Sequence, residues 1–217
     1  MGPLIVIFAQ AHAAGLLGHE DLMLFMPVLP ILLLVTIAIV TIASRRGLLG
    51  ASDGEVDIAG PLVVVAATLS VGAAGIHFAV IQEHLATDPA AAGFFLAIGW
   101  FQVIWAMAYL VRPNDALRQI GAIVSVGVIA LWLVSRTTGL PFGSQPWIPE
   151  PVGMADLFAT SFEVVLVGLI GAALLPRFAR RVSGYKMAIE KAYVLGSFTV
   201  VTVAVLTGLA LLGGSAG

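Results

Sequence analysis

The stretch AGPLVVVAATLSVGAAGIHFAVIQEH, residues 59–84, decides the fold class. It contains no Asp, Glu, Lys or Arg before Glu83, and it would be apolar on every side of a helix. About 20 such residues are enough to cross a bilayer as a helix. A strand of a membrane β-barrel would instead alternate polar and apolar residues over about ten positions. The stretch therefore predicts a membrane-spanning helix.

The rest of the 217-residue chain resembles this stretch, being 60% hydrophobic and only 10% charged. Soluble domains are about 25% charged. We expect an all-α integral membrane protein, with residues 1–217 forming a single transmembrane domain. It would be a bundle of six transmembrane helices plus a short apolar N-terminal helix, with an outer loop at 136–154. The six spans are expected at about 22–44, 59–84, 91–112, 116–135, 155–176 and 188–213.

Basic residues set the expected orientation in the plasma membrane, because cytoplasmic loops are enriched in Lys and Arg. In the six-span arrangement, nine of the ten cations fall on one side, and only Arg136 lies on the other. That side is therefore predicted to be cytoplasmic, and the C-terminus extracytoplasmic. The nine are Arg45, Arg46, Arg112, Arg118, Arg177, Arg180, Arg181, Lys186 and Lys191.

The N-terminal segment GPLIVIFAQAHAAGLLG, residues 2–18, is apolar but lacks the basic start of a signal peptide. It is either a short seventh span or a helix at the outer interface. Both arrangements place His12 and His19 near the outer side.

Cysteine is absent from the sequence, which excludes disulfides and thiolate metal sites. No nucleotide-binding fingerprint or basic nucleic-acid patch occurs, so no nucleic-acid partner is expected.

Glu163 is the most informative polar residue, because it lies inside the fifth expected span. A charged group at that depth costs about 2–3 kcal/mol and usually faces the interior of the bundle with a partner. His77 lies at a matching depth on the oppositely directed second span. His84 and Asp156 follow at i, i+7, two turns further out on the same helix faces. We therefore predict an inner layer of His77 with Glu163 and an outer layer of His84 with Asp156, joined by Glu83.

Imidazole and carboxylate are ligands of divalent transition metals, here Cu, Zn or Fe. His77 and Glu163 would supply two ligands, and His19 or His12 a third, with His84 and Asp156 forming an outer entry site. Haem is disfavoured, because His77 and His84 are two turns apart on one helix and only His12 or His19 could complete an axial pair.

Structural alternatives exist for each of these residues. Glu163 could form an ion pair with Arg136, the only outer-side arginine, and His77 could make a structural hydrogen bond to a neighbouring helix. Histidines near helix ends, such as His84, are often only interfacial. Gln102, in the middle of the third span, is expected to make a hydrogen bond inside the bundle rather than to bind a ligand.

Three function classes survive, and the sequence does not decide whether any of them is enzymatic. The first is a membrane protein with an outward-facing His/carboxylate metal site, acting in metal handling or as an oxidoreductase. The second is an accessory subunit of a larger membrane complex, in contact with other membrane subunits or with copies of itself. The third is a proton-coupled or metal transporter.

The outer loop is expected to be ordered and to fold over the outer mouth of the bundle, docking through Phe142 and Trp147.

Overall fold

The computed structural model describes residues 42, 55–177, 180 and 185–214, and it is a helical membrane protein. Each of its five helices is long and apolar enough to cross a bilayer. The expected span at 22–44, apart from Ile42, and the N-terminal segment with His12 and His19 lie outside the described residues. The described elements are β1 (Glu55–Asp57), α3 (Ala59–Thr87), α4 (Pro89–Val111), α5 (Asp115–Thr137), α6 (Met154–Leu174), β2 (Lys186–Ala188) and α8 (Ile189–Gly214).

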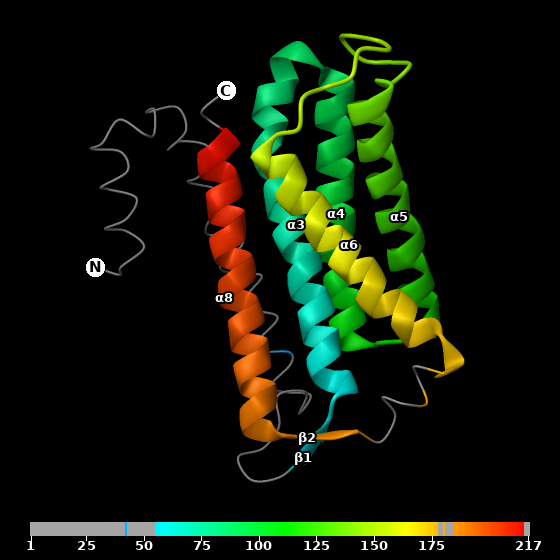
Figure 1. Ribbon diagram of the computed structural model, residues 1–217, viewed down its shortest axis with the longest axis vertical. Helices are drawn as coiled ribbons and strands as arrows, with labels where there is room; N and C mark the ends of the chain where they lie inside the picture. Colours follow the sequence, from blue (N-terminus) through cyan, green and yellow to red (C-terminus); the bar gives the residue numbers. More distant parts are fainter. Residues whose placement is uncertain (1–41, 43–54, 178–179, 181–184, 215–217) are drawn as a thin grey trace, which may run out of the picture.

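The helices alternate in direction, with α3, α5 and α8 running one way and α4 and α6 the other (Figure 1). We call the end that carries the α3–α4 turn and residues 138–153 the loop end. The opposite end, which carries β1 and β2, is the strand end. In Figure 1, α6 crosses the bundle obliquely, whereas α3 and α4 stand nearly upright behind it.

Helix α3 forms the centre of the bundle and packs against α4, α6 and α8. In its most apolar stretch 72% of the residues are buried, against 17% in α5. A helix surrounded by other helices needs apolar residues on all sides, which explains why α3 shows no polar face. Gly72 marks the closest approach, because a Cβ atom there would collide with Val203 of α8 and crowd Phe162 of α6.

Short polar turns connect the antiparallel helix pairs α3–α4 and α4–α5. Asp88 caps α4 by accepting a hydrogen bond from the backbone N–H of Ala91 at 3.1 Å, and Pro89 occupies the first helical position. Asn114 caps α5 in the same way, accepting from the N–H of Leu117 at 2.9 Å. Such caps satisfy backbone donors that a helix cannot pair internally.

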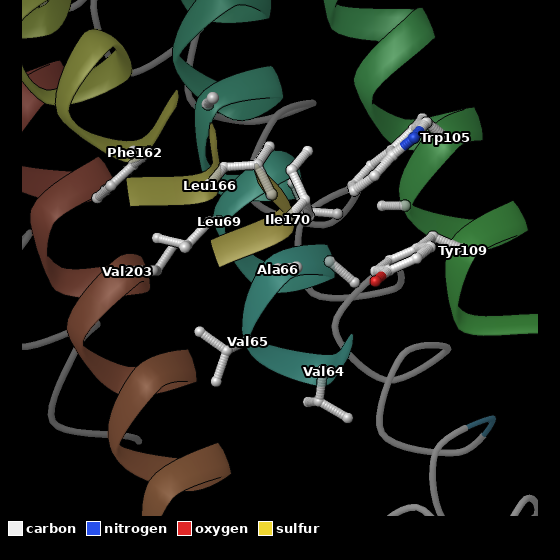
Figure 2. Close-up of a cluster of buried hydrophobic side chains, with 14 of the residues drawn as sticks. Val64, Val65, Ala66, Leu69, Trp105, Tyr109, Phe162, Leu166, Ile170 and Val203 are labelled. Atoms are coloured by element: carbon white, nitrogen blue, oxygen red, sulfur yellow. The ribbon is translucent and has the colours of Figure 1, made fainter. Parts of the chain in front are cut away.

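The interior of the strand-end half is mostly apolar (Figure 2), with the hydroxyl groups of Thr68, Ser70 and Tyr109 as exceptions. Side chains of α3 meet those of α6 on one side and the stacked rings of α4 on the other, while α8 contributes Val203. The labelled members are Val64, Val65, Ala66, Leu69, Trp105, Tyr109, Phe162, Leu166, Ile170 and Val203. Through these contacts α3, α4, α6 and α8 pack together on the strand-end side of the polar residues described next.

Two short strands, β1 and β2, close the strand end. They pair antiparallel, with Glu55 opposite Ala188 and Asp57 opposite Lys186. The pairing brings the start of α3 next to the start of α8, which lie far apart in the sequence.

Candidate functional site

Three buried polar side chains meet between α3, α4 and α6. Nε2 of His77 lies 3.4 Å from Oε1 of Glu163, and Nε2 of Gln102 donates a 2.7 Å hydrogen bond to the same oxygen. His77, Gln102 and Glu163 are 5%, 2% and 1% exposed. The predicted contact between His77 and Glu163 is therefore present. Gln102 makes the expected hydrogen bond within the bundle, and Glu163 is its acceptor.

The Glu163 carboxylate is only half satisfied. Its second oxygen, Oε2, is buried and finds no hydrogen-bond partner among the described residues, and the same holds for Oε1 of Gln102. Leaving a buried acceptor unpaired costs about 1–3 kcal/mol, more for a charged group. These two atoms are acceptors, so what they lack is a donor or a cation.

A cavity of about 390 Å³ extends from Glu163 towards the loop end. Side chains of α3, α4, α5 and α6 and of the 138–153 segment line it. Apolar residues form much of its middle, including Val80, Phe94, Phe95 and Leu131, whereas polar residues lie at its two ends. His77 and Glu163 form what we call the floor of the cavity.

His84 also lines the cavity, but the predicted outer layer is wrong. The ring of His84 does not pair with Asp156, and Glu83 is exposed and lines no part of the cavity. Instead, Nδ1 of His84 lies 2.8 Å from the backbone oxygen of Val80, one turn earlier on its own helix. A carbonyl oxygen can only accept, so Nδ1 is the donor in this contact. Its ring meets that of Phe95 edge to face at 4.9 Å.

Arg136 does not reach Glu163, so the alternative ion pair predicted from the sequence is also wrong. Its guanidinium bridges Glu150 and Asp156 at the loop end. Glu150 is brought there because its backbone N–H donates to the carbonyl oxygen of Ser135 at 3.0 Å. Both carboxylates that neutralise Arg136 thus lie nearer to its guanidinium than Glu163 does. Asp156 pairs with Arg136 and not with His84.

The 138–153 segment crosses the loop end of the bundle and lines part of the cavity (Figure 1). The segment lies over the mouth of the cavity as expected, and Phe142 lines the cavity, but Phe142 and Trp147 are 58% and 65% exposed, so they are not buried as docking residues. A polar tether holds the segment instead: Oδ2 of Asp88 accepts from the backbone N–H of Ser144 at 3.0 Å. The N–H groups of Ala91 and Ser144 stabilise the charged carboxylate and lower the pKa of Asp88 below its ordinary value.

The roles of two residues of this site were not predicted from the sequence. Asp88 is followed by a proline, the usual order for a helix cap, and this signal was available. Phe95 stacks on His77 with ring centroids 5.7 Å apart and also contacts His84 and Phe94. Nothing in the sequence distinguishes Phe95 from the other aromatic residues of its helix.

The metal ligands expected from the sequence are only partly brought together. His77 and Glu163 meet, whereas His84 and Asp156 have other partners, and His12 and His19 lie outside the described residues. Within the described part of the chain, no three His, Asp or Glu side chains are grouped closely enough to hold a metal ion. Gln102 does not line the cavity, but its Oε1 is a further buried oxygen without a partner among the described residues.

No protein-family model, curated protein or solved structure matches this chain.

Proposed function

We propose that this protein is a multi-pass protein of the plasma membrane whose loop end and C-terminus are extracytoplasmic. Six spans are proposed, the sixth at residues 22–44, and the N-terminal segment forms a short interfacial helix or a seventh span. The distribution of cations supports this orientation, because Arg136 is the only Lys or Arg at the loop end among the described residues.

We further propose that the protein binds a cation from the extracytoplasmic side, at the floor of the cavity. One observation carries this proposal: Oε2 of Glu163 is a buried carboxylate oxygen without a partner among the described residues, at the floor of a cavity. A buried carboxylate requires hydrogen bonds or a counter-charge. His77 and Gln102 orient the carboxylate through Oε1, which leaves Oε2 for the ligand.

A divalent transition metal (Cu, Zn or Fe) is the cation that the donor atoms suggest, for metal handling or redox chemistry. His77 would contribute a nitrogen and Glu163 an oxygen at about 2.0–2.2 Å. Gln102 could supply an amide oxygen, and His12 or His19 a further nitrogen. The hydrogen bond of His84 is typical of metal-binding histidines, which usually donate the N–H of the nitrogen that does not bind the metal to a carbonyl or carboxylate oxygen. Because His84 lies two turns along α3 from His77, towards the loop end, its position suits a site where a metal ion enters the cavity.

Metal titration of the purified protein tests the site. Zn²⁺ and Cu²⁺ are titrated calorimetrically, and metal content is measured by elemental analysis after purification. Glu163→Gln keeps the size of the side chain but removes its charge, and we expect it to weaken binding by about tenfold or more. Glu83→Gln is the matched control, because Glu83 is exposed on the same end of the bundle and lies outside the cavity. Equal affinity of both variants would contradict the assignment.

The apolar interior of the strand-end half argues against the transporter alternative. Between Glu163 and the strand end, the described core consists of side chains such as Leu69, Leu166 and Ile170, and the buried hydroxyls of Thr68 and Ser70 there donate to backbone carbonyl oxygens. A proton or ion relay would need Asp, Glu, His, Lys or Arg side chains there, and the described core of this half contains none. An accessory subunit would use the floor residues only to join α3, α4 and α6. In that case Glu163→Gln would lower stability, while the native protein would bind no cation.

A further inference from the structure

The cavity is larger than a metal ion requires. Its volume of about 390 Å³ lies in the range of small-molecule sites, about 300–1,000 Å³. A water molecule occupies about 30 Å³ in the liquid, and a metal ion with one or two waters would fill only a small part of the space. The remaining space is bounded largely by apolar side chains of α4 and α5. These walls suit a ligand with an apolar body.

The charges around the cavity favour a cation. Four carboxylates and one guanidinium line it among the described residues. Arg136 is already paired with two of the carboxylates, Glu150 and Asp156, and Asp88 accepts from two backbone N–H groups. Glu163 is therefore the carboxylate left with a free buried oxygen, and it lies where the head of a ligand would reach the floor.

Aromatic rings line the cavity, and one of them, Phe95, lies next to the floor. Phe95 stacks on His77 and meets Phe94 edge to face at 5.6 Å, and Trp132 of α5 also lines the cavity. The faces of such rings attract organic cations, with a gain of about 0.5–2 kcal/mol that is largest when the cation is desolvated. The same rings pack against an apolar or aromatic ligand body.

We infer that the occupant of this cavity is a small organic ammonium ion: a protonated amine with an apolar or aromatic body. Its N–H group donates a hydrogen bond to Oε2 of Glu163, and its body lies along Phe94 and Phe95. A free acceptor oxygen selects an amine with an N–H over a quaternary ammonium, which has none. The inference rests on the proposed cation site at Glu163, and it names an organic cation in place of a metal ion as the ligand that fills the cavity.

A ligand series on the native protein tests the inference. The probes are 2-phenylethylamine, the neutral 2-phenylethanol and the quaternary (2-phenylethyl)trimethylammonium, with calorimetric titration in detergent and EDTA present to exclude divalent metals. We expect the amine to bind about tenfold more tightly than either analogue, as a charge-assisted hydrogen bond predicts. Glu163→Gln should lose this preference, and Glu83→Gln should keep it.

Each outcome decides one question. Equal binding of the alcohol would show an apolar cavity without cation selectivity, and equal binding of the quaternary ion would show that no N–H is recognised; either result overturns the inference. If Zn²⁺ binds through Glu163 but the amine does not, the inference fails while the proposed cation site stands. If neither binds, both fail. Because the three probes are compared on the unaltered chain, the test holds even if Glu163→Gln does not fold.

Discussion

At the scale of single residues, Gln102 holds the carboxylate of Glu163 in place. Its amide donates the shortest hydrogen bond that Glu163 receives from the described residues, at 2.7 Å. Gln102→Leu keeps the position filled but removes this donor, so a second carboxylate oxygen loses a partner. We expect the free energy of unfolding to fall by about 1–2 kcal/mol, since hydrogen bonds inside membranes are worth little more than those in water. Unfolding in mixed micelles with increasing SDS measures the loss.

Gln119→Leu is the control for this change. Gln119 is exposed on α5, and the same substitution there removes no buried hydrogen bond. A similar loss of stability in both variants would mean that the contact between Gln102 and Glu163 contributes nothing specific.

The sequence predicts some of these residue contacts and not others, for physical reasons. The contact between His77 and Glu163 follows from depth, because two polar residues at the same level of antiparallel helices avoid lipid by meeting. The partner of Arg136 does not follow, because it depends on where an irregular loop places Glu150. His84 shows a third case: a hydrogen bond to its own helix competes with any partner across the bundle.

At the scale of elements, Asp88 connects the α3–α4 turn to the 138–153 segment. The N–H of Ala91 and then that of Ser144 lower its pKa, so the folded protein holds this carboxylate charged more strongly than the unfolded chain. The unfolded state therefore binds more protons, and stability rises with pH. The contribution is complete above the unfolded pKa of about 3.9 and is lost as pH falls through the lower folded pKa.

We expect thermal stability of the native protein to decline below about pH 4, in part through this group. Asp88→Asn does not titrate and keeps one oxygen, which can still accept from the N–H of Ala91, but it places an amide NH2 where Oδ2 accepts from the N–H of Ser144. The difference in melting temperature between the native protein and this variant should therefore shrink as pH is lowered from 7 to 3. A constant difference over this range would show that the charge of Asp88 has no part in capping α4 or tethering the segment.

At the scale of the whole molecule, hydropathy predicts which segments are helices but not how they are arranged. The five described helices cover the five segments expected between residues 59 and 213, because length and apolarity alone determine a membrane span. The central place of α3 and the oblique course of α6 are set by side-chain packing, for example at Gly72, which the sequence does not reveal. That course nevertheless carries Glu163 to His77 and Gln102, so the site depends on it.

The orientation of the bundle decides from which side a ligand reaches the cavity. In the described residues, the strand end carries Arg112, Arg118, Arg177, Arg180, Lys186 and Lys191, which favours its retention in the cytoplasm. Arg136, at the loop end, does not oppose this orientation strongly, because Glu150 and Asp156 neutralise it. We therefore expect the cavity to open to the extracytoplasmic side.

Labelling of single cysteines tests this orientation, and the absence of native cysteine makes each introduced thiol the only one in the chain. Gln145→Cys lies in the 138–153 segment and Ala188→Cys in β2, and both positions are exposed. A membrane-impermeant maleimide should label position 145 in intact cells and position 188 only after permeabilisation. The reverse pattern would place the mouth of the cavity in the cytoplasm, so that any cation bound at Glu163 would have to come from inside the cell. Labelling of both positions in intact cells would show that the charge asymmetry does not fix a single orientation.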